Sequence, residues 1–269
     1  MGLSRADRAE ALEHLAGFGR SLADVFFPRS CIGCAATMDD RTAIDICPAC
    51  LEELSLPDGN YCPRCGAARG EFSSKCPNCY NMHPAMDRTS AFGFYEGRLR
   101  EALVAYKFEG RADLARTLGT LAGLAARRMW PRAKFDCVVA VPLHRARRRE
   151  RGFDQARELA RFAAGVVGAP FEGRLLKRVR ATESQMGLTR TARMRNVAGA
   201  FEARGQAPPL VLVVDDIMTT GATVSEASRT LKRAGAGRIF AAVVARSPLG
   251  EAGTAAGGAE ASSAERTVT

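Results

Sequence analysis

Residues 211–223 read Val-Leu-Val-Val-Asp-Asp-Ile-Met-Thr-Thr-Gly-Ala-Thr. The four apolar residues at the start predict a parallel strand covered on both faces, and the Ala/Val/Leu-containing run after this stretch predicts a helix. The loop between them can point backbone N–H groups at an anion. Gly221 permits close backbone approach, and hydroxyl donors are offered by Thr219, Thr220 and Thr223. The stretch therefore predicts an α/β fold with a phosphate site at a strand end.

Two adjacent carboxylates, Asp215 and Asp216, come directly before this loop. Carboxylates accept hydrogen bonds from vicinal ribose hydroxyls and hold hydrated magnesium beside a pyrophosphate. The combination predicts a phosphorylated sugar as the ligand. A strand end followed by an ordinary capped helix is the alternative, but capping needs only one of these residues. The stretch lacks the Gly-x4-Gly-Lys of a nucleotide P-loop, which argues against an ATPase.

Eight of the nine cysteines form four Cys-x2-Cys pairs. Such a pair can hold one metal ion from a tight turn, and the spacing between pairs is typical of zinc ribbons. We therefore expect two structural zinc ions, with the pairs used either sequentially or interleaved. A disulfide framework would go with an export signal, and we find no apolar run of signal length in residues 1–27. The expected ligands are Cys31, Cys34, Cys47, Cys50, Cys62, Cys65, Cys76 and Cys79.

The 269-residue chain has a formal net charge of +10, which favours an acidic partner, either a phosphate-bearing small molecule or a nucleic acid. No run of apolar residues approaches the length of a transmembrane segment. With reduced, metal-binding cysteines, these features lead us to expect a cytoplasmic protein.

The chain divides into four parts. Residues 1–27 predict an amphipathic helix that docks on the zinc module or a partner, or else contacts a membrane surface. Residues 28–87 predict the zinc-binding module, which needs metal for much of its stability. Residues 88–246 alternate strands and helices with short links, as in a mostly parallel sheet. Residues 247–269 have the composition of a disordered tail.

A second predicted strand, over residues 135–141, ends in a turn and a basic run. If this strand lies beside the acidic one, both strand ends can share a ligand, and turn amides with guanidinium groups suit a pyrophosphate. The alternative for the basic run is a solvated helix face. The residues expected to contact the ligand here are Val141, Pro142, Leu143, His144 and Arg145.

Other candidates lie farther along the chain. Lys107 ends a predicted helix over residues 98–107 and either faces the site or lies on the surface. Asp154 is a plausible helix cap, and Gln155 is a possible ligand contact. Residues 181–196 predict a long loop that could close over pyrophosphate and exclude water, although its charge equally suits a nucleic-acid contact. The lid residues that we select are Gln185, Gly187, Arg190 and Arg195, with Arg193 in the same segment.

The order of these motifs resembles the ComF family of competence-associated phosphoribosyltransferase-like proteins. The resemblance runs from about residue 27 to 246. It rests on the cysteine pairs, Tyr-Lys-Phe at 106–108, Val-Pro-Leu at 141–143, Arg-Gly-Phe-Asp-Gln at 151–155, Gln-Met-Gly-Leu at 185–188 and the stretch 214–223. Two departures are Asp154, where the family usually has Asn, and Met186, where it often has Thr.

The resemblance implies a zinc module joined to a type I phosphoribosyltransferase fold that binds 5-phosphoribosyl 1-diphosphate (PRPP) with magnesium. It also implies a role in DNA uptake or processing. Asp215, Asp216 and Lys107 are the expected catalytic residues, and Ala222 joins the phosphate-binding set. Three functions remain open: a phosphoribosyltransferase with an unknown acceptor, a PRPP sensor without turnover, and an adaptor that holds single-stranded DNA for a DNA-uptake helicase or channel.

Overall fold

The computed structural model describes residues 29–38, 44–54, 56, 59–69, 76–144, 149, 152–182 and 189–248. The helix expected over residues 1–27 and most of the expected tail lie outside these residues, as do Arg145, Gln185 and Gly187.

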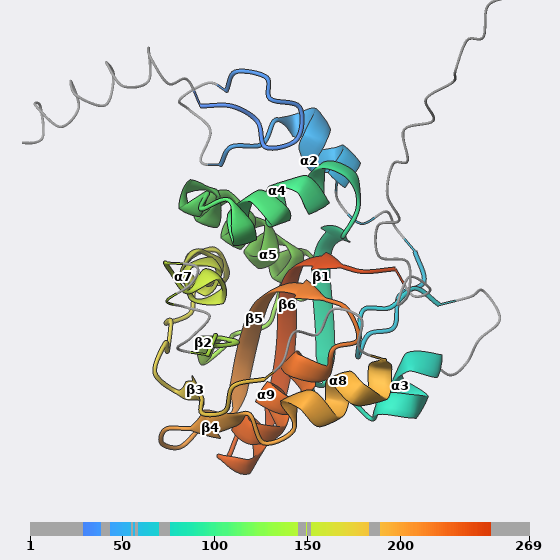
Figure 1. Cartoon of the computed structure of the whole chain (residues 1–269), viewed down its shortest axis with the longest axis vertical. Helices are drawn as coiled ribbons and strands as arrows, with labels where there is room; N and C mark the ends of the chain where they lie inside the picture. The colour runs from blue at the N-terminus through green and yellow to red at the C-terminus, as the bar shows by residue number, and fades with distance from the viewer. Residues whose placement is uncertain are drawn as a thin grey trace, which may run out of the picture.

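The centre of the molecule is a four-stranded parallel sheet with strand order β1-β6-β5-β2 (Figure 1). The strands are β1 (Arg88–Phe94), β2 (Cys137–Ala140), β5 (Leu210–Met218) and β6 (Arg238–Arg246). The apolar residues of β5 and β6 are buried, as expected for strands covered on both faces. Because all four strands run the same way, their carboxyl ends meet at one edge of the sheet, which confirms the expected parallel architecture.

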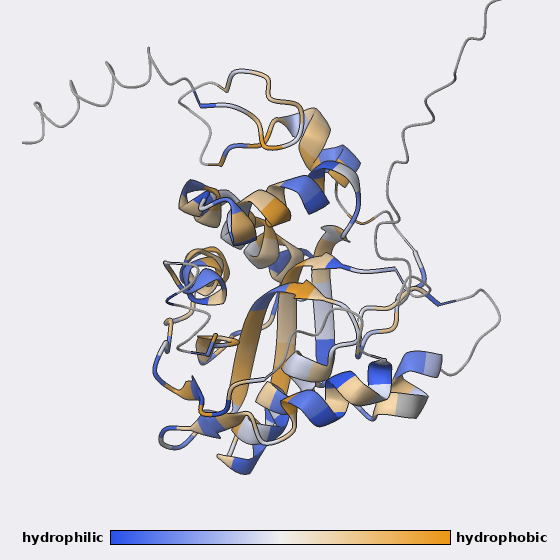
Figure 2. Cartoon of the chain, viewed as in Figure 1, coloured by the Kyte–Doolittle hydropathy of each residue, from blue (hydrophilic) through white to orange (hydrophobic). Residues whose placement is uncertain are grey.

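Helices cover both faces of this sheet. α5 (Ala115–Met129) and α7 (Gln155–Val167) pack together on one face, and α9 (Ala222–Arg233) lies on the other (Figure 1). Alternate residues of β5 point to opposite faces of the sheet. Leu212 and Val214 pack with α5 and α7, and Val211 and Val213 pack with α9. Figure 2 shows the hydrophobic strands at the centre and hydrophilic residues on the outer helices.

Close packing of α5 on α7 requires a glycine. A Cβ atom at Gly119 would lie 2.5 Å from the Leu159 carbonyl oxygen. The absence of a side chain therefore lets the two helices approach, and this contact fixes the layer that supports β2 and β5.

α4 (Gly97–Phe108) and the short helix η1 (Ala112–Leu114) connect β1 to α5. Two short strands, β3 (Leu176–Arg178) and β4 (Phe201–Ala203), pair in a separate antiparallel sheet.

The prediction of a long loop over residues 181–196 is wrong for its last part, because Arg190–Val197 forms helix α8. The Thr189 hydroxyl caps this helix by accepting a hydrogen bond from Ala192 N at 3.3 Å. The polar and basic composition of this segment favoured a loop, although several of its residues are good helix formers. Packing against α9 stabilises the helix.

Two cysteine modules precede the sheet. The first cysteine module, residues 29–38 and 44–54, includes α2 (Pro48–Leu54) and joins the core formed by α5 and α7. The second cysteine module, residues 59–69 and 76–82, includes α3 (Pro77–Met82) and joins the core formed with α9. Among the residues that the structure describes, no helix is both long and apolar enough to cross a membrane.

Candidate phosphate site and zinc centres

The eight paired cysteines gather in two groups. Within each group the four sulfur atoms lie within 4.8 Å of one another. A tetrahedral zinc ion with Zn–S bonds of about 2.3 Å requires sulfur atoms about 3.8 Å apart. The Sγ atoms of Cys34 and Cys47 are 3.8 Å apart, and those of Cys62 and Cys79 are 3.6 Å apart. The groups therefore fit two structural zinc ions, with the pairs used sequentially: Cys31, Cys34, Cys47 and Cys50, then Cys62, Cys65, Cys76 and Cys79.

Backbone amides prepare the first group for metal. Burial raises the pKa of Cys31, but N–H groups that donate to its sulfur, from Cys47 at 3.3 Å and Gly33 at 3.4 Å, lower it overall to about 6. A thiolate is the form of cysteine that binds zinc. His83, four residues after Cys79, lies outside both groups and ends α3 in a left-handed conformation.

The carboxyl end of β5 carries the two candidate carboxylates. Asp216 forms an ion pair with Lys107, whose Nζ lies 2.9 Å from Oδ2, and the two side chains are only 12% and 16% exposed. Asp216 Oδ1 also accepts a hydrogen bond from Ile217 N at 2.5 Å. Lys107 comes from the last turn of α4, so the helix end and the strand end meet at this point. Lys107 was expected either to face the site or to lie on the surface, and in the structure it lies beside the acidic pair.

Asp215 lies in a different electrostatic environment. Burial, followed by the negative charge of Asp216, raises its pKa to about 8, although Lys107 acts in the opposite direction. Its Oδ1 accepts a hydrogen bond from Asp216 N at 2.9 Å. Because ionised Asp215 is disfavoured here, a bound cation or hydroxyl donors from a ligand would stabilise it.

Two buried residues hold Lys107 in place. Tyr106 is fully buried, donates its hydroxyl to the Gln155 carbonyl oxygen at 2.8 Å, and stacks edge-on against Phe153. Gln155 is 1% exposed, and its Nε2 donates to the Lys107 carbonyl oxygen at 3.4 Å. Gln155 therefore supports the end of α4 from the core, and its contact with a ligand stays a prediction. The expected cap is confirmed, since Asp154 accepts from Arg157 N at 3.3 Å.

The phosphate loop, residues 218–223, surrounds a hollow of about 40 Å³ that is lined by residues 215 and 217–224. This volume holds only a few water-sized groups. Gly221 has a left-handed φ of 84° and directly precedes α9, whose N-terminal amides begin at the hollow. The Thr220 hydroxyl accepts a hydrogen bond from Ala222 N at 3.3 Å, which stabilises the turn.

The loop after β2 lies next to the phosphate loop. Val141 N donates to the Val214 carbonyl oxygen at 3.0 Å, so pairing with β5 continues past the end of β2. Pro142, Leu143 and His144 follow in half-buried positions. The structure thus brings the two expected strand ends together.

The lid candidates on α8 differ in where they point. Arg195 is exposed and Arg190 is partly buried. Arg193 is the arginine whose Nη1 donates to the Thr219 hydroxyl, at 2.9 Å. No sequence signal separates Arg193 from its neighbours, because only the packing of α8 on α9 selects the helix face that meets the loop.

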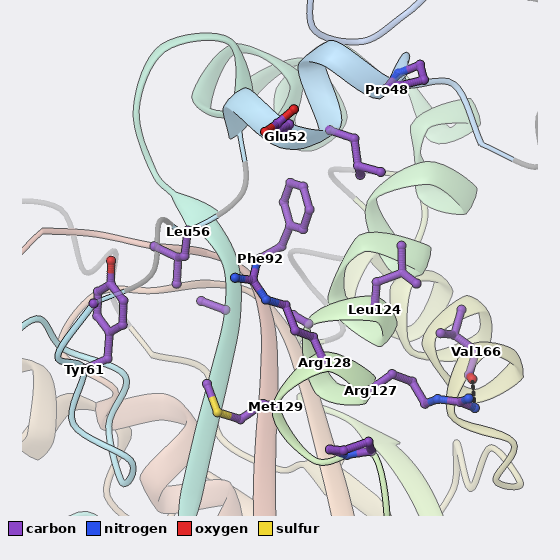
Figure 3. A pocket seen from close by; sticks show the side chains of 15 residues that line it. Pro48, Glu52, Leu56, Tyr61, Phe92, Leu124, Arg127, Arg128, Met129 and Val166 are labelled. Carbon is purple, nitrogen blue, oxygen red and sulfur yellow. Dashed lines mark hydrogen bonds between the residues drawn. The ribbon is translucent and has the colours of Figure 1, made fainter.

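A much larger cavity, of about 1100 Å³, lies away from the strand ends. It is bounded by α2, the edge strand β1 and the C-terminal half of α5, and Figure 3 shows Phe92, Leu124 and Met129 around it with Arg127 and Arg128. Its lining has no paired carboxylates, and the helix start that it includes is Pro48 of α2, which has no backbone N–H to donate. The small hollow at the phosphate loop is therefore the better candidate for a phosphorylated ligand.

Comparison with known proteins identifies relatives of the whole arrangement. Residues 22–81 match the double zinc ribbon domain. The chain is 30% identical over 222 residues to Competence protein F of Haemophilus influenzae, covering 80% of this chain and 95% of that protein. It is 31% identical over 199 residues to the DNA utilization protein YhgH of Escherichia coli, covering 72% of this chain and 87% of that protein.

Solved structures with some similarity include an allosteric regulatory enzyme of purine biosynthesis, with a TM-score of 0.36, 19% identity and coverage of 52% of this chain and 30% of that chain. An adenine phosphoribosyltransferase has a TM-score of 0.33 and 18% identity, with coverage of 51% of this chain and 71% of that chain. Scores of this size do not carry the assignment, which rests on the sequence relatives. Because the identity to Competence protein F extends over nearly the whole of that protein, the chain belongs to the ComF family of competence proteins.

Proposed function

We propose that residues 88–246 bind PRPP with magnesium, and that the protein uses this site in DNA uptake or processing during competence. One observation carries the proposal: the Asp215–Asp216 pair directly precedes a helix-start phosphate loop and is joined by Lys107 from a distant helix. Paired acids suit ribose hydroxyls and a metal, and the loop suits a phosphate. The relatives named for competence and DNA utilization support the cellular role.

Different residues of the site bind different parts of PRPP. The amides and hydroxyls of the phosphate loop hold the 5-phosphate, in the hollow before α9. Asp215 and Asp216 accept hydrogen bonds from the ribose hydroxyls, and Lys107 keeps Asp216 ionised. The loop that begins at Val141 faces the pyrophosphate from the neighbouring strand end.

Magnesium fits the donor set, because two adjacent carboxylates beside a pyrophosphate are typical ligands, and it would neutralise charge on the leaving group. In a transfer reaction the acceptor attacks C1 of the ribose, and the bond from C1 to the pyrophosphate oxygen breaks. Arg193, hydrogen-bonded to Thr219, brings positive charge to the side of the loop covered by α8. Its role is to stabilise phosphate charge and to limit access of water.

Calorimetric titration of the zinc-loaded full chain with PRPP and magnesium tests the binding site. Replacing both Asp215 and Asp216 by Asn should weaken binding about a hundredfold or more, because each lost charge-assisted hydrogen bond is worth about 1.5–3 kcal/mol. Asp113→Asn, which removes an exposed carboxylate paired with Arg111, is the control and should leave binding unchanged. An unaltered titration curve for the double variant would refute the proposal. Pyrophosphate release with candidate acceptors then separates an enzyme from a sensor.

A second candidate function, adaptor for single-stranded DNA, is favoured by the net charge of +10. It predicts binding to a labelled oligonucleotide that weakens steeply with salt, with a log–log slope of about 0.7 for each phosphate neutralised. Saturating PRPP should compete if Arg190 and Arg193 serve both ligands, and should have no effect if the basic surface is separate. Fluorescence anisotropy measures both, and no binding at low salt would exclude the adaptor.

A further inference from the structure

A buried arginine at the end of β6 links the second cysteine module to the phosphate loop. Arg246 is 1% exposed. Its Nε donates to the Cys65 carbonyl oxygen at 3.2 Å, and its Nη1 donates to the carbonyl oxygens of Met218 at 2.7 Å, Ser247 at 3.2 Å and Thr219. One guanidinium group therefore holds the backbone of a zinc-ligand residue and the start of the phosphate loop together.

The charge of Arg246 needs a partner, because an unpaired ion is costly to bury. Within the part of the chain that the structure describes, no carboxylate forms an ion pair with it. Burial lowers the pKa of Arg246, and charge on Cys65 and Cys76 of the second group acts in the opposite direction. Four thiolates outweigh the charge of one zinc ion, so the loaded site is a net anion. The second zinc centre thus supplies the countercharge for Arg246.

The hydrogen bonds of Arg246 also orient the loop. In a trans peptide the carbonyl group and the following N–H point in opposite directions. Holding the Met218 and Thr219 carbonyls toward the guanidinium turns the N–H groups of Thr219 and Thr220 away from it. Free N–H groups are the donors that a bound phosphate requires.

Two further contacts tie the same regions together. Just after the second cysteine module, Ala85 N donates to the Ser225 hydroxyl in the first turn of α9, at 2.9 Å. Met86 is 1% exposed, and its methyl group lies 3.3 Å from the position that a Cβ atom of Gly221 would occupy. The first cysteine module instead contacts α5, where Asp45 N donates to the Thr117 hydroxyl at 2.9 Å.

We propose that Arg246 is a positioning residue through which zinc binding in the second cysteine module controls the conformation of the phosphate loop. Without zinc, that module has little core of its own and loosens. Arg246 then loses the Cys65 carbonyl and its countercharge, and its hold on the Thr219 carbonyl is released, whereas the Met218 carbonyl keeps its hydrogen bond from Ser247 N. The inference relies on the proposed function only for the identity of the ligand. The coupling itself is a property of the ligand-free protein.

Hydrogen exchange of the ligand-free full chain, followed by mass spectrometry, tests the coupling. Cys79→Ser breaks the second zinc centre and should speed exchange in residues 218–225 by about tenfold or more. Cys34→Ser breaks the first centre in the same way and should leave that segment unchanged. Equal exchange rates in the two variants, with one zinc ion lost from each by elemental analysis, would overturn the proposal.

Two substitutions at Arg246 separate its role from general support of the fold. Arg246→Met keeps the length of the side chain but removes its donors, so exchange in residues 218–225 should be fast although both zinc ions remain bound. Adding Cys79→Ser should then produce no further increase. Arg246→Lys retains charge and donors and should restore most of the protection. If Arg246→Met does not fold, stepwise zinc removal from the wild type by a chelator still tests the coupling between zinc binding and exchange in residues 218–225.

Titration with PRPP and magnesium keeps the two proposals distinct. If the wild type binds PRPP, Cys79→Ser and Arg246→Met should each weaken binding at least about tenfold, and Cys34→Ser should not. If the wild type does not bind PRPP, the proposed function fails while the exchange data still decide the coupling. Unchanged exchange in Cys79→Ser refutes the coupling whatever the titration shows.

Discussion

The ion pair between Lys107 and Asp216 should contribute measurably to folding. Its atoms lie 2.9 Å apart, and the side chains are 16% and 12% exposed. Removing one partner of a buried pair costs about 3–5 kcal/mol, because the other charge is left buried without compensation. Since some exposure remains, we take the lower end, about 3 kcal/mol, for Lys107→Met. In a domain of this size each kcal/mol shifts Tm by about 2–4 °C, so Tm should fall by about 6–12 °C.

Thermal unfolding of the zinc-loaded protein, followed by circular dichroism, measures this effect. Asp216→Asn completes a double-mutant cycle, and the double variant should be less destabilised than the sum of the single ones. Lys232→Met is the matched control, because the pair of Lys232 with Asp87 has 35% and 29% exposed side chains and should be worth less than about 1 kcal/mol. Equal losses of Tm in the two lysine variants, with a coupling energy below about 0.5 kcal/mol, would refute the reasoning.

Three further predictions follow from the site. Because burial and then its neighbour's charge raise the pKa of Asp215 to about 8, the unfolded state loses this proton near pH 4 and the folded state near pH 8. The carboxyl group of Asp215 therefore lowers the stability of the fold as pH rises from about 4 to about 8. Asp215→Asn should raise the Tm of the ligand-free protein, and the difference in Tm from the wild type should grow over this pH range. A difference in Tm that does not depend on pH would contradict the reasoning. Joint replacement of Cys34 and Cys47 by Ser should leave one zinc ion by elemental analysis, whereas loss of both would indicate interleaved pairs. Gly221→Ala should cost about 1–2 kcal/mol at its left-handed φ and weaken PRPP binding, while Gly165→Ala, in open space on α7, should not, as melting and titration will show.

Local features of the sequence were sufficient for the main elements. The apolar run of β5 identified a strand covered on both faces, and the Thr-Thr-Gly-x-Thr that follows identified a loop at a helix start, because strand burial and helix initiation depend on neighbouring residues. The Cys-x2-Cys spacing likewise identified metal binding, since two thiolates on one tight turn need no distant partner.

Features that join distant segments were decided only by the tertiary structure. The sequential pairing of the cysteines and the order β1-β6-β5-β2 depend on which segments pack together. The support that Gln155 gives to the end of α4 also required the structure, because Gln155 and Lys107 are far apart in the sequence.

Arg246 is the clearest example of a residue whose role could not be predicted from the sequence. In the sequence it is one basic residue after the apolar run 239–245, and nothing nearby explains a charge at that position. In the structure it lies between a zinc-ligand residue 181 positions away and the phosphate loop 28 positions away. The sequence by itself determined the strand, the loop and the metal ligands, because each depends on neighbouring residues. Which charges and carbonyls meet in the interior was decided by packing, because the free energy of a buried ion depends on every group that surrounds it.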